Sequence, residues 1–329
     1  MLCLPCKDEV LKSRQSYFDQ AIEISRLLNI KLTSRKWNGE RVAMCGFPLL
    51  HLDRHLKTLV QQEQRFVAIC EEFLVYTSPT SKEFERRITR IVTPGTLIDE
   101  SFLNPTENNY LLAIGTPKVT SDLPEPVGLA WIDVSTGEFF AKLCELSNLR
   151  DELARIAPRE VVLEAALKDH SNHPIYQQFI EGKFLVSYTD TTSSDAQILD
   201  DTAQRLSSLH PTSSPFAEKP VNDVGMLAEL SDPSFTHQES LAINVLTKFL
   251  KDNLLEHMPN LESPLQESTQ DRMQIDLHTI NGLEIRESGD GSAKGSLLSV
   301  VKRTVTSGGT RLLARWLCKS CRFAQITLA

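Results

Sequence analysis

Residues 66–100 read FVAICEEFLVYTSPTSKEFERRITRIVTPGTLIDE and contain two runs of β-type residues that a polar connection separates. Residues 66–70 form the first run and residues 87–92 the second, in which successive side chains alternate with the period of a strand. The second run stops at Pro94-Gly95, a dipeptide that turns the chain. Because a fresh β run begins at residue 110, we predict that one folding unit ends at this dipeptide and that another follows it.

The segment before residue 66 predicts a small mixed α/β unit. Apolar residues at helical spacing predict helices over residues 19–28 and 52–61. Residues 29–33 alternate like a short strand, and residues 42–45 start another strand. Between them lies SRKWNG, residues 34–39, which we interpret as a polar, basic loop that ends in a turn dipeptide. We assign residues 1–98 to this first domain.

The segment after Pro94-Gly95 predicts a second α/β unit and the helical start of a third. Strands are predicted at residues 110–114, 128–133, 138–143, 160–163 and 184–188, with a helix at 149–156. Strands that come first and then alternate with helices are typical of a ribonuclease-H-like fold. Residues 207–236 are rich in Ser, Pro and Asp and are interpreted as a loosely structured passage. We assign residues 99–235 to the second domain, and residues 236–329, with a predicted helix at 241–255, to the third.

Composition and charge limit the classes of function. The chain has 329 residues, 41% of them hydrophobic, and its net charge of -8 argues against a generally basic nucleic-acid binder. Residues 1–98 nevertheless hold 15 Lys and Arg against 11 Asp and Glu, while the remaining residues hold 20 against 32. The first domain therefore offers the plausible phosphate-facing surface. No apolar run approaches the roughly 20 residues of a membrane span, so no membrane partner is expected.

The amino-acid sequences of all three units resemble those of the MutS family of DNA mismatch-repair proteins. Its mismatch-recognition domain is resembled by the segments CGFPLLHLDRHLKTLV, VAICEE and RRITRIVTPGTLIDE. Its connector domain is resembled by YLLAIG, GLAWIDVSTGEFF and ELARIAPREVVLE. SLLSVVKRTVTSGGTRLLARWL resembles the opening of its core and lever region. The resemblance covers roughly residues 17–317, and its first motif is closest to the mitochondrial MutS homologues of fungi. A mitochondrial location is therefore expected by resemblance, with a nuclear or cytoplasmic one as the alternative, although no transit peptide is seen in this chain.

The resemblance implies double-stranded DNA with mismatches as the ligand and a second subunit as a dimer partner. It also implies ATP and Mg as cofactors of the full-length family. No GxxxxGK[ST] loop occurs in these 329 residues, and CKSCRFAQITLA at the end departs from the family pattern. We expect the chain to be an N-terminal fragment without the ATPase and clamp, to be no enzyme itself and to hold no cofactor.

The resemblance also directs attention to particular residues. The family's Phe-x-Glu, which wedges beside a mispaired base, should fall on Ser13-Arg14-Gln15 and is missing there, so the first sixteen or so residues are off-pattern. Tyr17 and Phe18 are predicted to be helical and to pack in the core. Arg35 and Lys36, on the predicted loop, and Arg90, on the exit strand, are the residues expected to touch DNA phosphates. From the residues alone, a solvated surface is the preferred interpretation of these cations, and with the resemblance the two interpretations are equally good.

Other sequence patterns superficially resemble nuclease, phosphate-binding or metal-binding sites, but none is expected to act as one. Asp133 and Glu138 flank a predicted hairpin turn, where polar residues are common, so metal-dependent nuclease activity is not expected. GDGSAKGS at residues 289–296 has the wrong order for a phosphate-binding loop and is predicted to be a surface loop. His51 and His55 have the spacing of a zinc pair without a third ligand, so His55 is expected to pack and His51 to be exposed. The two CxxC pairs at opposite ends of the chain are interpreted as unpaired thiols.

Two functions of different classes remain open. The first is a MutS-type protein that binds mismatched DNA, with weak binding and no mismatch preference expected here because the wedge is missing. The second is a stand-alone, non-catalytic module that docks protein partners through the connector domain. Comparing a mismatched with a matched duplex separates the two.

Overall fold

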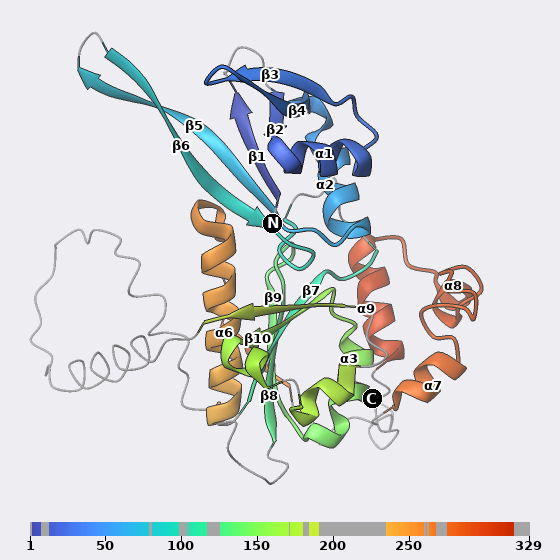
Figure 1. Cartoon of the computed structure of the whole chain (residues 1–329). Helices are drawn as coiled ribbons and strands as arrows, with labels where there is room; N and C mark the ends of the chain where they lie inside the picture. The colour runs from blue at the N-terminus through green and yellow to red at the C-terminus, as the bar shows by residue number, and fades with distance from the viewer. Residues whose placement is uncertain are drawn as a thin grey trace, which may run out of the picture.

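The computed structural model describes residues 2–7, 13–78, 81–98, 104, 106–116, 126–170, 172–179, 184–190, 235–259, 261, 263–267 and 275–318. Two sheets of six strands each form the two α/β units, and a group of short helices adjoins the second of them (Figure 1). This architecture confirms the predicted fold class. Almost all of the predicted passage at residues 207–236 lies outside the described residues.

The first sheet has the strand order β3-β4-β2-β1-β5-β6. The strands are Leu2–Lys7 (β1), Ser13–Tyr17 (β2), Thr33–Trp37 (β3), Glu40–Pro48 (β4), Val67–Ser78 (β5) and Ser81–Val92 (β6). Helix α1 (Phe18–Leu27) and helix α2 (Leu52–Leu56), which continues as a π-helical turn over Lys57–Gln62, pack with the sheet around buried Ala21, Ile24, Leu56 and Leu59. The predicted helices at 19–28 and 52–61 are thereby confirmed.

Strands β5 and β6 are longer than the sequence predicted. They pair antiparallel from Val67↔Val92 out to Ser78↔Ser81 and project from the body of the molecule as a two-stranded arm (Figure 1). The predicted polar connection between two short strands is therefore wrong, because most of it is strand. Cross-strand contacts support the arm: Arg86 pairs with Glu72, and the Arg87 guanidinium lies 3.8 Å from the centroid of the Phe73 ring.

The second sheet has the order β11-β10-β7-β8-β9-β12. Its strands are Tyr110–Gly115 (β7), Val127–Asp133 (β8), Glu138–Cys144 (β9), Glu160–Glu164 (β10), Leu185–Thr189 (β11) and Leu265–Gln266 (β12). β7, β8 and β9 pair antiparallel, whereas β10 runs parallel to both β7 and β11. The five predicted strands are confirmed. Helix α3 (Leu149–Ile156) packs on one face with the 3-10 turns Leu146–Asn148, Ala165–Asp169 and Pro174–Phe179 beside it.

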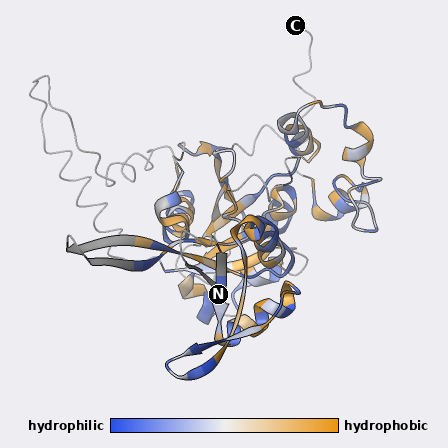
Figure 2. Cartoon of the chain, turned by 90° about the horizontal axis from the view of Figure 1, so that it is seen from above, coloured by the Kyte–Doolittle hydropathy of each residue, from blue (hydrophilic) through white to orange (hydrophobic). Residues whose placement is uncertain are grey.

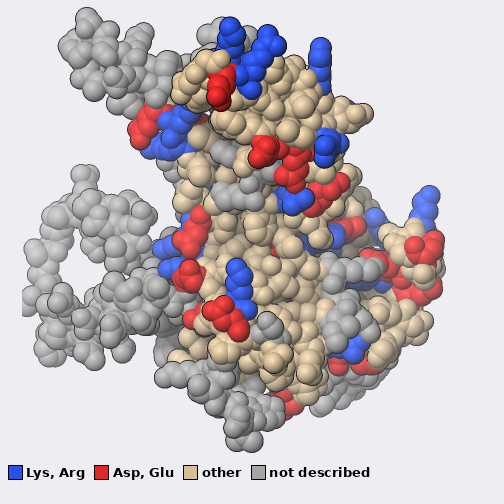
Figure 3. Space-filling model, in the orientation of Figure 1, with Lys and Arg blue, Asp and Glu red and all other residues tan. Residues whose placement is uncertain are grey.

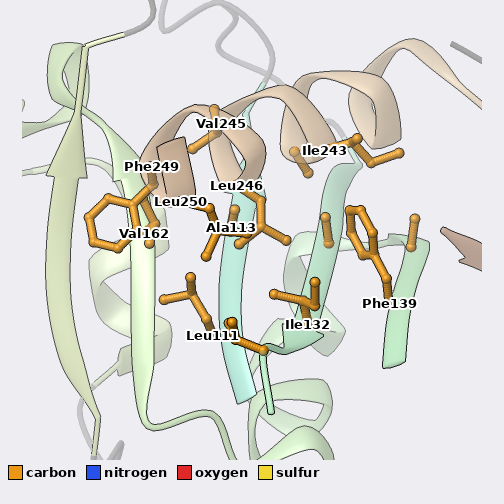
Figure 4. Close-up of a cluster of buried hydrophobic side chains, with 14 of the residues drawn as sticks. Leu111, Ala113, Ile132, Phe139, Val162, Ile243, Val245, Leu246, Phe249 and Leu250 are labelled. Atoms are coloured by element: carbon orange, nitrogen blue, oxygen red, sulfur yellow. The ribbon is translucent and has the colours of Figure 1, made fainter. Parts of the chain in front are cut away.

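Helix α6 (His237–Leu254) covers the other face of this sheet. Its side chains Val245, Leu246, Phe249 and Leu250 point at the sheet and share one buried cluster with residues of β7–β10 (Figure 4). The predicted boundary between residues 235 and 236 separated this helix from the sheet that buries it, so the structure groups α6 with the second domain. Thr236 and Glu239 form a capping box that fixes where the helix begins.

The last described segment contains α7 (Leu277–Gly282), α8 (Leu297–Val301) and α9 (Ser307–Leu317). It is joined to α3 by polar contacts: the Leu277 amide donates to Asp151 at 2.9 Å, and the Arg286 guanidinium donates to the carbonyl oxygen of Arg155 at 2.5 Å. Hydrophobic residues concentrate on the central strands and on the helices that cover them (Figure 2). Within the described ranges, no helix combines the length and the hydrophobicity that crossing a membrane requires.

Candidate nucleic-acid interface

The predicted basic loop at residues 34–39 is in fact a β-hairpin. Thr33–Trp37 forms strand β3, which pairs antiparallel with β4 from Thr33↔Met44 to Trp37↔Glu40. Asn38 and Gly39 connect the strands with φ angles of 48° and 90°, the positive values that a type I′ turn requires. Arg35 and Lys36 therefore lie on a strand and not on a loop, which corrects the prediction of their local structure.

Strand β3 is an edge strand and is exposed along its whole length. Because side chains alternate across a strand, Arg35 and Trp37 lie on one face and Lys36 on the other. The register places Tyr17 of β2 opposite Met44 of β4, and Met44 opposite Thr33, so Tyr17 shares the face of Arg35 and Trp37. The other face carries buried Cys45 and Phe47 against the helices. We call the first of these the open face of β2, β4 and β3.

A chain of hydrogen bonds orders the side chains of the open face. The Tyr17 hydroxyl donates to Gln15 Oε1 at 2.6 Å and accepts from Arg35 Nη1 at 3.3 Å. The Trp37 ring contacts the Tyr17 ring edge-on, with 5.7 Å between their centroids. Tyr17 thus fixes one cation and one aromatic ring at the same end of the sheet.

Phe18 departs from the prediction that it packs in the core. It is the first residue of α1, its φ angle is 58°, and its side chain is 55% exposed. Its ring lies 6.3 Å from the ring of Trp37, which is itself 43% exposed. Tyr17 is half-buried and belongs to strand β2, so it is not helical as predicted. The helical hydrophobic pattern of residues 19–28 does not extend to residues 17 and 18.

Cations gather on the β3–β4 hairpin. Lys36 pairs with Arg41 across the two strands, which puts both on the face opposite Arg35, and all three side chains are exposed. Figure 3 shows Lys and Arg side chains over β3 and β4, with acidic side chains among them. Exposed Lys and Arg on a narrow hairpin can reach phosphates on either side of it without reading base sequence.

The structure does not bring Arg90 to this hairpin. Arg90 pairs with Ile69 on β6, the opposite edge of the six-stranded sheet, and is half-buried. Its expected phosphate contact remains a prediction, and it belongs to a different part of the surface from Arg35 and Lys36. The positions expected for the Phe-x-Glu wedge, 13 and 15, lie on β2 with the same parity as Tyr17. That register places the wedge positions on the open face.

The two acidic residues considered for nuclease activity, Asp133 and Glu138, make structural contacts. Asp133 is fully buried and caps its turn, accepting from the Ser135 amide at 3.0 Å and the Ser135 hydroxyl at 2.6 Å as well as from the Asn109 amide. Glu138 lies 3.4 Å from Arg315 of α9. In the part of the chain that the structure describes, no group of three or more His, Cys, Asp or Glu is placed to hold a metal ion.

The histidines, the Gly-rich segment and the cysteines also have structural surroundings. His55 packs on Phe47 with 4.5 Å between ring centroids, and its pKa is lowered by burial and then by Arg54 and His51, while His51 is exposed, as predicted for both. Residues 289–296 form a turn that leads into α8, where Ser296 is the N-cap. The cysteines whose side chains are described, Cys45, Cys70, Cys144 and Cys318, are all buried. Cys3, Cys6 and Cys321 lie outside the described side chains.

A buried carboxyl group joins the first domain to the second. Glu160, fully buried on β10, accepts hydrogen bonds from the Thr93 hydroxyl at 2.6 Å, the Gly95 amide at 2.8 Å and the Ser187 hydroxyl at 2.5 Å. Burial raises the pKa of this carboxyl, and the three hydrogen bonds act in the opposite direction. Strand β6 ends at Val92, just before Pro94-Gly95, and Glu160 holds this turn against the second sheet.

Sequence reasoning missed residues that give the hairpin its character. Trp37 and Arg41 were not singled out and Phe18 was expected to pack in the core, although Asn38-Gly39 between two short alternating segments is a strong hairpin signal. Recognising the hairpin would have paired Lys36 with Arg41 and placed Trp37 beside the turn. No sequence pattern signals the exposure of Phe18, which follows from its backbone conformation.

Three family models match consecutive parts of the chain. Residues 13–101 match "MutS domain I", residues 109–262 match "MutS domain II" and residues 278–323 match "MutS domain III". The first match covers the open face and the β5–β6 arm. The second runs through α6 and therefore agrees with the packing of that helix on the second sheet.

Curated relatives resemble the chain over nearly all of its length. The protein named "DNA mismatch repair protein MutS" from Dinoroseobacter shibae is 34% identical over 313 residues, which are 92% of this chain and 32% of the relative. Proteins of the same name from Ruegeria pomeroyi and Rhizobium meliloti are each 33% identical over 91% of this chain, covering 32% and 31% of their own lengths. The chain thus spans about a third of the length of these relatives.

Proposed function

The chain belongs to the MutS family of DNA mismatch-repair proteins, and from this premise we propose that it serves mismatch repair by holding duplex DNA against its first domain. The contacts to the duplex come from the exposed cations of the β3–β4 hairpin. Arg35, Lys36 and Arg41 supply phosphate contacts there. Arg90, on the opposite edge of the sheet, would add a separate contact further along the duplex.

One observation carries this proposal: strand β3 is exposed on both faces and bears cations on both, in a chain whose net charge is negative. A strand of the protein interior buries at least one face, whereas every residue of β3 is exposed. Lys and Arg on an edge strand also discourage pairing with another strand, which leaves the hairpin available to a phosphate backbone.

Discrimination of mismatches is expected to be weak in this chain. Position 13 is Ser and position 15 is Gln, so neither the aromatic wedge nor its carboxylate stands where the family motif falls. The Gln15 side chain is also engaged by the Tyr17 hydroxyl. A matched duplex and one with a G·T pair should therefore bind with nearly equal affinity, because phosphate contacts carry no sequence information.

Nucleotide chemistry does not fit the residues of this chain. No GxxxxGK[ST] loop occurs in the sequence, and the Gly-rich residues 289–296 form a turn that leads into α8, with Lys294 before Gly295. We propose that ATP and Mg act in the longer proteins of the family and that this chain neither binds nor hydrolyses ATP. ATP turnover by the purified chain above that of a mock preparation would contradict this.

The proposal also includes a dimer partner and a cellular location. A second MutS-type subunit would close around the duplex, as the family resemblance implies. The motif CGFPLLHLDRHLKTLV supports kinship with the mitochondrial MutS homologues of fungi, and hence a mitochondrial location. Fractionation of cells that express the tagged gene product tests this location, and recovery in the nuclear or cytosolic fraction instead would overturn it.

A second candidate function, docking of a protein partner, is favoured by a separate observation. Val300, Val305 and Trp316 on and beside α8 and α9 are 68%, 100% and 63% exposed. These apolar side chains lie in the third segment and not on the connector sheet, where sequence reasoning had placed the docking surface. Self-association that is lost in a Trp316→Ser variant would support this candidate.

The experiment that tests duplex binding uses labelled matched and G·T duplexes at two salt concentrations. The wild-type chain should bind both weakly and equally, with lower affinity at the higher salt. Arg35→Ala combined with Lys36→Ala should weaken both, whereas Lys302→Ala combined with Arg303→Ala, a matched pair of adjacent exposed cations in the third segment, should change neither. Equal weakening by the two double variants would place the interface elsewhere.

A further inference from the structure

Two aromatic rings are exposed beside the cations of the β3–β4 hairpin. Phe18 comes from the start of α1 and Trp37 from the end of β3, and their ring centroids lie 6.3 Å apart with an interplanar angle of 59°. Single exposed apolar side chains are ordinary on protein surfaces. Two adjacent rings that different elements bring together form an apolar patch of two ring faces tilted against each other.

The local structure holds both rings outward. Phe18 has a φ angle of 58°, a conformation in which a bulky side chain is strained. The strain is not accompanied by burial, since the Phe18 side chain is 55% exposed. Trp37 rests edge-on against Tyr17, whose hydroxyl is fixed between Gln15 and Arg35. Strain that the surrounding structure maintains without burying the ring is a sign that the ring serves contact with another molecule.

The surroundings of the rings select the class of ligand. Arg35, Lys36 and Arg41 are all exposed on the same hairpin, so an anionic ligand is favoured. A single-stranded nucleic acid combines flat base faces with regularly spaced phosphates, and proteins bind it with aromatic platforms beside cationic grooves. Duplex DNA keeps its base faces inside the stack and can use only the cations.

We propose that Phe18 and Trp37 form a stacking platform for unpaired bases of single-stranded DNA. Its phosphates meet Arg35 on the face of Trp37, and Lys36 and Arg41 on the other face of the hairpin add to the positive charge. The platform goes beyond the proposed duplex binding, which needs the cations alone. The two activities share the hairpin but not the rings. Substitution of the rings therefore separates a failure of this inference from a failure of the proposed function.

The fluorescence of Trp37 can be used to detect its contact with a base. The chain has three tryptophans, of which Trp131 is buried, so a Trp316→Phe background leaves Trp37 as the exposed one. In that background, an oligo(dT) of about 12 nucleotides should quench tryptophan emission as it binds, and a blunt duplex should not. Phe18→Gly and Trp37→Leu should each weaken oligo(dT) binding roughly 5- to 150-fold while duplex affinity stays within about twofold of the parent.

The controls are matched to these variants. Leu50→Ala removes a side chain that is 88% exposed elsewhere on the first domain and should change nothing, and Trp37→Tyr should retain most of the oligo(dT) affinity. Phe18→Gly relieves the positive φ, so its melting temperature should not fall and a misfolded variant cannot explain weak binding. Unchanged oligo(dT) binding in Phe18→Gly and Trp37→Leu overturns the proposal. So would tighter binding of oligo(U), which would make the ligand RNA, or a ring-dependent self-association, which would make the face a protein interface.

Discussion

Glu160 shows how a single side chain can tie two domains together. Its carboxyl oxygens accept from Thr93 and Gly95 of the exit turn and from Ser187 of β11. Sequence reasoning recognised the turn at Pro94-Gly95 because Pro and Gly have local conformational signatures. It could not recognise Glu160, because the three donors lie 27 to 67 residues away along the chain and nothing in a strand sequence marks such a partner.

The raised pKa of Glu160 predicts how stability depends on pH. The native state holds this proton more tightly than the unfolded state, whose carboxyl titrates near the ordinary value of 4.5. The free energy of unfolding should therefore fall as the pH rises from that value through the raised native pKa. Glu160→Gln keeps the shape without the titration, so the melting temperature of the variant relative to wild type should rise from acid to neutral pH.

Thermal melts at several pH values measure this dependence. Glu145→Gln, the same substitution at an exposed Glu of the second domain, serves as the control for the loss of one carboxyl group. A difference between Glu160→Gln and wild type that stays constant with pH would show that Glu160 does not titrate differently in the native state.

The hairpin β3–β4 illustrates why an exposed strand is hard to predict. Residues 33–37 contain Thr, Ser, Arg, Lys and Trp, so no hydrophobic alternation distinguishes a strand from a polar loop. Strands β7 to β10 of the second sheet, by contrast, are buried along most of their length, and their boundaries were predicted to within a residue or two. Burial produces the pattern on which such predictions depend, and an edge strand that meets a ligand has none.

The turn of this hairpin gives a direct test of its role. Gly39 has a φ angle of 90°, so Gly39→Ala should strain the turn by about 1–2 kcal/mol and loosen the register that positions Arg35 and Lys36. Asn38→Gly, at a φ angle of 48°, should be tolerated. Duplex affinity is the measurement, and equal affinities for the two variants would mean that the hairpin geometry is not needed for binding.

Helix α6 shows a different limit of sequence reasoning. Its hydrophobic periodicity identified the helix, but periodicity cannot say which sheet a helix covers. The glycines of the sheet carry that information, since a Cβ at Gly128 would stand 1.9 Å from the Gln238 carbonyl oxygen, and one at Gly115 would stand 2.5 Å from the Ala242 amide nitrogen. The start of α6 therefore lies directly on the ends of β7 and β8.

This close approach predicts the effect of adding one methyl group. Gly128→Ala should push α6 from the sheet and lower the free energy of unfolding by about 1–3 kcal/mol, the usual cost of overpacking. Gly282→Ala, at a helical glycine with open space around it, should be neutral or slightly stabilising. Chemical denaturation measures both, and a neutral Gly128→Ala would contradict the close packing of α6.

The molecule as a whole separates its charges. The acidic excess lies after residue 98, whereas the exposed, cationic β3 lies in the first domain, far from α7–α9 (Figure 1). The sequence alone allowed the family, the domain order and this asymmetry to be predicted, since each depends on local sequence motifs or on composition. It could not predict that Arg35 shares a face with Trp37, that Lys36 pairs with Arg41 or that Arg90 lies on the opposite edge, because strand pairing decides these positions.

The dependence of duplex affinity on salt tests most directly whether the β3–β4 hairpin is the DNA contact. Each phosphate contact contributes about 0.9 to the slope of log affinity against log salt concentration. Arg35→Ala combined with Lys36→Ala should reduce the slope by about 2, whereas Lys302→Ala combined with Arg303→Ala should leave it at the wild-type value. An unchanged slope in the first double variant, or an equal reduction in both, would contradict the account.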